Sequence, residues 1–185
     1  MKLVPLCLIL PVVLLATGCG PLGPSDDLSG KNFFVTSQLF SGNLNGTAGA
    51  DLKCQLAATT AGLGGVYKAW LSDFSTDALH RVSLSYPLRR STGLTVFAND
   101  SARISGVLAA APNVDEYGKT VSTPFVWTNS DSLGYGLMSD CGQWTTDNGA
   151  QYGAYGNANS TNSSAWTQSG TATCDQKLRL YCIEQ

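Results

Sequence analysis

Cysteines are the residues of this 185-residue chain whose chemistry is best bounded by their spacing. Cys7 and Cys19 lie in and just after an apolar N-terminal run, and the remaining four are Cys54, Cys141, Cys174 and Cys182. Zinc sites normally use cysteines separated by about two to four residues, often with histidines, and this chain has no such pair and one histidine. Four cysteines in an exported domain favour two disulfides, for which three pairings are open.

Catalytic groups are sparse. His80 is the only imidazole, and no G-x-S-x-G elbow accompanies it, so we expect a partly exposed histidine on a helix surface. Asp51 is expected in the first turn of a helix, where the dipole favours a carboxylate. We predict a non-catalytic protein without a cofactor. A secreted enzyme stays open as an alternative if two carboxylates, or His80 and an acid, meet in a pocket. The other scattered carboxylates considered are Asp73, Asp77, Asp100 and Asp140.

The segment "WTTDNGAQYGAYGNANSTNSSAWTQSG", residues 144–170, holds the most unusual group of ligand-binding side chains. A long segment without periodicity is typical of a functional loop or of disorder. Aromatic side chains among small polar residues provide rigid contact area with adaptable hydrogen bonding, as in antibody paratopes. We predict a recognition surface formed by Trp144, Tyr152, Tyr155 and Trp166. The alternative is that Trp144 and Trp166 belong to the core and the other residues form a solvated loop.

The first residues indicate export. Lys2 precedes an apolar run from Leu3 to Ala16, too short to span a bilayer, which needs about 20 apolar residues. The run ends in "LATGCG", which looks like a bacterial lipobox. We therefore predict a lipoprotein signal peptide over 1–18 and acyl chains such as palmitate on Cys19. A Pro, Gly and Ser-rich linker over 19–30 would then tether a domain over 31–185. An ordinary secretory signal that leaves Cys19 as an odd thiol is the alternative.

Several elements are expected to position these groups. The spacing of Leu52, Leu56, Thr59 and Leu63 predicts an amphipathic helix that carries Cys54 and stops at 62–65. Strands are predicted over 66–73, 93–100 and 122–129 and at the C-terminus, and a short helix is expected to begin at Thr76 as its N-cap.

Charge limits the partners. The formal net charge is −2 for the whole chain, and loss of Lys2 with a signal peptide would make it one unit more negative. This balance argues against a nucleic-acid-binding protein, which should be basic. Only 13% of the residues are charged, which is typical of a loop-rich exported protein.

Three blocks occur in the order found in endostatin: "GADLKCQLAATTAGLGGVYKAWLSD", "VWTNSDSLGYGLMSDCGQW" and "CDQKLRLYCIEQ". Over about residues 32–185 the chain resembles endostatin and is similar to a family of bacterial endostatin-like lipoproteins, the leptospiral surface proteins among them. The stretch from about 74 to 119 departs from the pattern. The resemblance implies an α+β, C-type-lectin-like fold. It also implies nested disulfides that join Cys54 to Cys182 and Cys141 to Cys174.

The family's metal sites are not expected here. The "APN" triplet at 111–113 lacks the carboxylate of the lectin calcium motif, and the residues before Cys174 offer no acid. Endostatin's zinc site uses N-terminal histidines, which this chain lacks. Endostatin binds heparin through surface arginines, and the basic stretch 80–91 with Arg103 is similar to such a region. We favour a solvated face for this stretch over a heparin site.

The sequence thus predicts a lipid-anchored binding module in the bacterial cell envelope, at the outer membrane or cell surface. By resemblance, its partner would be a protein such as a host matrix protein or a complement regulator. A calcium-independent carbohydrate-binding module and a structural envelope lipoprotein without a ligand are the alternatives.

Overall fold

The computed structural model describes residues 30–185, so the predicted signal peptide and Cys19 lie outside the described residues. These residues form an α+β structure with a mostly sheet core. None of the helices in residues 30–185 combines the length and apolarity needed to cross a bilayer. The elements in chain order are β1 (Lys31–Val35), α1 (Gly46–Thr60), β2 (Tyr67–Ala69), α2 (Ala78–Arg81), β3 (Leu88–Arg89), β4 (Thr95–Phe97), α3 (Asp100–Ser105), β5 (Phe125–Trp127), α4 (Cys141–Trp144), β6 (Tyr152–Asn157), β7 (Gly170–Thr173) and β8 (Arg179–Glu184).

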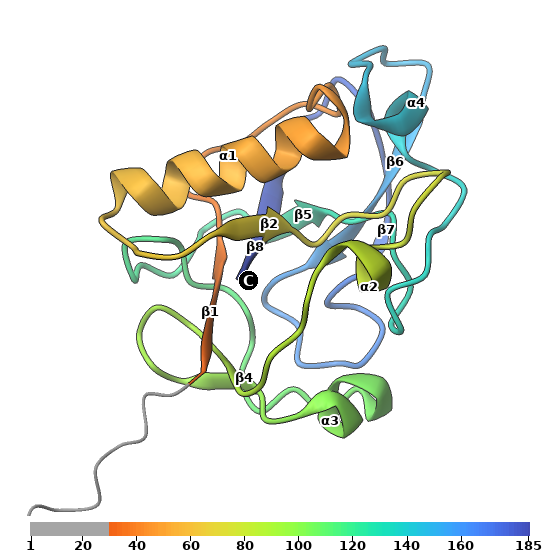
Figure 1. The fold of residues 1–185 in the computed structure, drawn as a ribbon. Coiled ribbons are helices and arrows are strands. Elements are labelled where there is room, and N and C mark those ends of the chain that lie inside the picture. Colours follow the sequence, from red (N-terminus) through yellow and green to blue (C-terminus); the bar gives the residue numbers. More distant parts are fainter. Residues whose placement is uncertain (1–29) are drawn as a thin grey trace, which may run out of the picture.

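The C-terminal strand β8 is the centre of the sheet. The strand order is β4-β3-β1-β8-β5-β6-β7, and β2 also pairs with β8. β1 runs antiparallel to β8 with Phe33 opposite Ile183, whereas β5 runs parallel to it. Figure 1 shows α1 lying above β2 and β8, with α2 beside them. The last strand of the chain therefore holds together elements from both halves of the sequence.

Alternate residues of a strand point to opposite faces of the sheet. In the central strands both sets of residues are buried. Phe33, Tyr181 and Ile183 belong to one hydrophobic cluster. Phe34 and Leu180 belong to a second cluster, which packs beneath α1. The sheet thus separates two cores, and β1 and β8 contribute to both.

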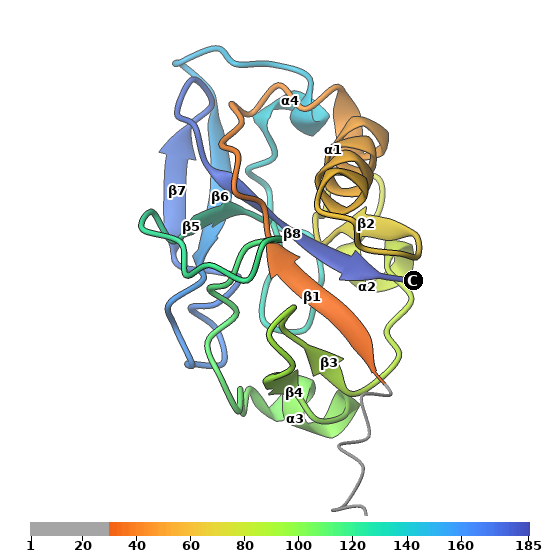
Figure 2. The same cartoon turned by 90° about the vertical axis from the view of Figure 1, so that its left-hand side faces the viewer.

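Two disulfides join distant elements. Cys54 of α1 is bonded to Cys182 of β8, and Cys141 of α4 is bonded to Cys174, just after β7. This is the pairing that the endostatin resemblance implied. Figure 2 shows α4 and α1 at one end of the molecule, with β3, β4 and α3 at the other. The outer bridge therefore ties the first helix to the last strand, as expected.

Helix α1 has the predicted position but not the predicted orientation. Its buried residues are Gly49, Ala50, Cys54 and Ala58, whereas Leu52 and Leu56 are 71% and 66% exposed. The small residues face the sheet because the bridge at Cys54 requires a close approach of helix and strand. Asp51 is also outside the first turn, contrary to expectation, and forms an ion pair with Arg81.

Other sequence expectations need correction at the level of elements. The N-cap position of α2 is held by Asp77 and not by Thr76. The segment 144–170, predicted to be irregular, contains β6, which pairs with β5 and β7. Small residues such as Gly153 allow β6 to lie against the inner disulfide and the Trp127 ring, so glycine-rich composition did not mark a loop here.

Candidate functional site

Two loops, 72–77 and 131–140, lie side by side next to α2 and present several exposed large apolar side chains. Figure 1 shows them along the right-hand side of the molecule, below α4. The main-chain N–H of Leu79 donates to the Gly134 carbonyl, and the Ser72 and Ser130 hydroxyls are 2.8 Å apart. We call the pair of loops 72–77 and 131–140 the paired loops.

Each of the paired loops is folded around its own aspartate. Asp131 Oδ1 accepts hydrogen bonds from the N–H groups of Leu133, Gly134 and Tyr135 at 2.8–2.9 Å. Asp73 Oδ1 accepts from the Ser75 N–H and hydroxyl at 2.8 and 2.7 Å and from the Thr76 N–H at 2.8 Å. An aspartate that bonds the backbone just ahead of it fixes a tight turn. The two turns are therefore ordered locally.

Two further aspartates join the loops to each other. Asp140 Oδ2 accepts from the Phe74 N–H at 2.8 Å, and Asp77 Oδ1 accepts from the Gly136 N–H at 2.7 Å. Gly134 (φ +96°) lies where an added Cβ would be 2.8 Å from the Trp70 ring. These contacts hold both loops in one arrangement, so the main chain that carries their exposed side chains is preorganised.

The most exposed large side chains of the paired loops are Phe74, Tyr135 and Met138, of which Phe74 is 74% and Met138 85% exposed. His80 stands edge-to-face against Tyr135 with ring centroids 6.3 Å apart. Exposed aromatics and methionine on a rigid support are typical of protein recognition surfaces, where these residue types are enriched. We call Phe74, Tyr135 and Met138 the loop patch.

The backbone that follows the loop patch is strained. Cys141, Gly142, Gln143 and Trp144 of α4 all have positive φ angles between 50° and 61°, so this turn is left-handed. Such a conformation costs about 1–2 kcal/mol for each non-glycine residue. The inner disulfide, the buried Trp144 ring and the hydrogen bond from the Gln143 N–H to Asp140 Oδ1 hold it in place. Strain of this kind clusters at functional sites.

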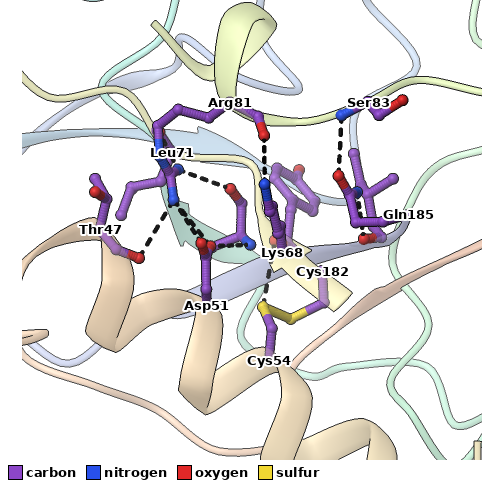
Figure 3. Close-up of polar contacts among 12 residues, drawn as sticks. Thr47, Asp51, Cys54, Lys68, Leu71, Arg81, Ser83, Cys182 and Gln185 are labelled. Carbon is purple, nitrogen blue, oxygen red and sulfur yellow. Dashed lines mark hydrogen bonds and ion pairs between the residues drawn. A yellow bond between two sulfur atoms is a disulfide. The ribbon is translucent and has the colours of Figure 1, made fainter. Parts of the chain in front are cut away.

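Arg81 fixes the base of the paired loops. Its Nη2 contacts both oxygens of Asp51 at 2.9 Å, and its Nη1 donates to the carbonyls of Ala69 and Leu71. Figure 3 shows the guanidinium between α1 and β2, close to the Cys54–Cys182 bridge. This arginine belonged to the basic stretch suggested for a glycosaminoglycan. Because its charge is neutralised by Asp51, it is a structural residue in this fold.

The predicted recognition residues are only partly accessible, and two of them need correction. Trp144 is fully buried, and its Nε1 donates to the Ser72 carbonyl at 2.8 Å. Trp166 is 1% exposed and packs against four aromatic rings. Neither can present its side chain to a ligand, since each fills one of the two cores. Tyr155 is half-buried against Phe125, and Tyr152 is exposed.

Tyr86 lines a cavity beside α2, and its surroundings favour the protonated phenol. A cavity of about 610 Å³ beside α2 is lined by residues that include Lys68, His80 and Tyr86. The Tyr86 hydroxyl is 3.0 Å from Asp100 Oδ1, and Arg103 contacts both groups. Burial, together with the hydrogen bond to Asp100, raises the pKa of Tyr86 to about 12. The environment thus disfavours the phenolate that a nucleophile or base would need.

His80 does contact an acid, since its Nδ1 is 3.2 Å from Asp77 Oδ2. The pair is local and largely exposed, and within residues 30–185 no hydroxyl or thiol hydrogen-bonds to His80. The same range contains no group of three histidine, cysteine or acidic residues spaced to hold a metal ion. The geometry around His80 therefore supplies an acid and a base without a nucleophile.

Sequence reasoning missed the loop patch, although one signal was present. "DFST" and "DSLGY" both begin with an aspartate followed by small or turn-forming residues, and both contain an aromatic residue. No protein-family model matches this chain, and no curated protein matches its sequence.

Proposed function

We propose that this protein is a lipid-anchored, non-catalytic binding module with a C-type-lectin-like, endostatin-like domain that recognises a protein ligand. The observation that carries the proposal is the loop patch: three large exposed side chains on loops that are fixed by four aspartates. The nested disulfides support the family assignment. Acylation of Cys19 would place the module on the bacterial envelope, at the outer membrane or cell surface, where an adhesin meets host matrix proteins or complement regulators.

Preorganisation explains why these loops suit binding. A surface that is already ordered loses less conformational entropy when a partner docks. Phe74 and Met138 offer apolar area for the centre of an interface, and Tyr135 adds a hydroxyl. A few such anchors usually supply most of the binding free energy.

The test uses the full chain, immobilised and challenged with panels of matrix proteins, serum proteins and glycans. Phe74→Ala/Met138→Ala should weaken capture of the protein ligand by about tenfold or more, because central anchors typically contribute at least 2 kcal/mol. Leu94→Ala/Val107→Ala removes exposed apolar area elsewhere and should bind like the wild type. Equal loss in both variants, or no capture at micromolar concentration, contradicts the proposal.

A carbohydrate-binding module that works without calcium is the second candidate, and the exposed Tyr135 and Tyr152 rings favour it because aromatic faces stack on sugars. Glycan binding that survives a chelator and is lost in Tyr135→Ala/Tyr152→Ala would replace the protein ligand with a glycan.

A further inference from the structure

A polar cavity lies at the opposite end of the molecule from α1 and α4. A cavity of about 410 Å³ is lined by residues from the start of β1 and from the turn between β3 and β4. Figure 2 shows β3 and β4 next to the beginning of β1, away from the disulfide-linked turn α4. Its lining residues are Gly30, Asn32, Arg89, Arg90, Ser91, Thr92 and Gly93.

Arg89 and Arg90 differ from the other arginines of the domain. Arg81 and Arg103 form ion pairs with aspartates, and Arg179 donates to three main-chain carbonyls. Within residues 30–185, no acid lies within ion-pair distance of Arg89 or Arg90. Two adjacent arginines thus line one cavity without an ion-pair partner in the described part of the chain.

Each of the two guanidinium groups makes one hydrogen bond to the protein in the described part of the chain. Arg89 donates to the Gly93 carbonyl at 3.2 Å, and Arg90 donates to Asn113 Oδ1 at 3.1 Å. Each guanidinium has five N–H donors. Both Nε atoms are buried without a partner in the described part of the chain, which leaves the terminal Nη groups to meet a ligand. Burial lowers the pKa of the Arg90 guanidinium. An oxyanion would supply both missing charge and missing acceptors.

The backbone around the cavity is shaped for the arginine side chains. Gly30 has φ +146°, and a Cβ added there would lie 2.6 Å from the Pro87 carbonyl oxygen and 3.3 Å from Arg89 Nε. Glu184, the acid that accepts from the Asn32 N–H, is neutralised by Lys31. Lys31 therefore offsets the charge of this acid.

We propose that the Arg89–Arg90 cavity binds a phosphate group, supplied either by a phospholipid headgroup or by free phosphate. Arginine suits this ligand because its planar fork matches two phosphate oxygens. The lipid source rests on the proposed anchor: Cys19 is eleven residues before Gly30, within about 40 Å when fully extended, so acylation would hold this end towards the membrane. The free-phosphate source needs no anchor.

The first test is calorimetric titration of inorganic phosphate into the full chain in a neutral detergent. Arg89→Gln/Arg90→Gln should lose at least about tenfold in affinity, and Arg89→Lys/Arg90→Lys should be intermediate because lysine keeps the charge without the fork. Lys53→Gln/Lys177→Gln removes the same charge elsewhere and should stay within about twofold of the wild type. Phe74→Ala/Met138→Ala should bind phosphate normally, which separates this proposal from the proposed function.

The second test identifies the source. Full chain is added to vesicles of phosphatidylcholine with or without phosphatidylglycerol, and the increment due to phosphatidylglycerol is measured. An increment that is lost in Arg89→Gln/Arg90→Gln assigns the headgroup, whereas phosphate binding without such an increment assigns free phosphate. Phosphate binding that is absent, or equal in the wild type and the Arg89→Gln/Arg90→Gln variant, overturns the proposal. Heparin binding through these arginines without phosphate binding also overturns it.

Discussion

Aspartates do much of the structural work in the paired loops. Asp73 and Asp131 each close a turn within one loop, while Asp77 and Asp140 connect one loop to the other. All four carboxylates accept hydrogen bonds from main-chain N–H groups that would otherwise bond to water. The side chains that bond the backbone are thus different from the side chains that the loop patch exposes.

Asp140 connects one of the paired loops both to the other loop and to the left-handed turn. Its two oxygens accept from the Phe74 N–H and from the Gln143 N–H inside the left-handed turn. Asp140→Ala should lower the free energy of unfolding by about 0.5–2 kcal/mol, since it removes the cap of the left-handed turn. Chemical denaturation measures this, with the exposed Asp147→Ala as a control that should show no change. Equal effects in the two variants would contradict the assigned role.

Asp73 makes the stability of the loop dependent on pH. Burial alone would raise the pKa of its carboxyl, but hydrogen bonds from Ser75 and Thr76 and the charge of Arg81 hold the pKa below 3.8. A carboxyl whose pKa is lower in the folded state stabilises the protein at pH values above its pKa in the unfolded state. That stability is lost as the pH falls through its pKa in the folded state. The stability difference between wild type and Asp73→Asn should therefore be constant near neutrality and shrink below about pH 3.8. A difference that stays unchanged in acid would refute this.

At the scale of elements, the position of α1 was predictable from the sequence, whereas its orientation was not. The helix was predictable because helix-forming residues precede the glycines at 62–65. Its orientation was not, because periodicity reports which residues share a face and does not report which face meets the sheet. The bridge from Cys54 to Cys182 decides the orientation and leaves Leu52 and Leu56 outside.

The orientation of α1 gives a direct stability test. Leu52→Gln/Leu56→Gln should change the free energy of unfolding by less than about 0.5 kcal/mol, as exposed substitutions usually do. Ala58→Leu, at a position that is fully buried against the sheet, should cost about 1–3 kcal/mol through overpacking. Denaturant titration of both variants compares them, and the opposite ranking would mean that the leucines face the core.

The two bridges should contribute unequally. Cys54 and Cys182 are 128 positions apart, and Cys141 and Cys174 are 33 apart. Loop-closure entropy assigns up to about 5 kcal/mol to the outer bridge and up to about 4 to the inner one. Paired Cys→Ala variants, unfolded under the same conditions, should follow this order. Loss of the inner bridge should also release the left-handed turn, seen as faster amide exchange over 141–146.

At the scale of the whole molecule, the sheet places the two proposed sites far apart. The paired loops run below α4 (Figure 1), whereas β3 and the start of β1, which line the Arg89–Arg90 cavity, lie at the other end of the molecule from α4 (Figure 2). An anchor at Cys19 would keep the arginines near the membrane and direct the loop patch away from it. The α+β class and both bridges were predictable from composition and resemblance. The two aspartate turns left a signal in the sequence, but the loop patch was not predictable, because Asp77 and Asp140 join loops that only the fold brings together.

The buried tryptophans explain the main error at the site. Trp144 and Trp166 stand in a glycine-rich, polar segment, which suggested exposure. In the structure, Gly156 of β6 lies close to the Trp166 main chain, and the two tryptophan rings pack in different hydrophobic clusters. The local composition therefore indicated the exposed residues of the segment and did not show that its two tryptophans are buried.

The most direct test of the proposed binding function is hydrogen–deuterium exchange of the full chain, free and bound to the protein that it captures from the panel. Binding through the loop patch predicts slower exchange over 72–77 and 131–140, with little change over 46–60 and 152–157. The Phe74→Ala/Met138→Ala variant should show no such slowing at the same ligand concentration. Slowing confined to α1 or to β6 and β7 would contradict the account, because the ligand would then occupy a different face.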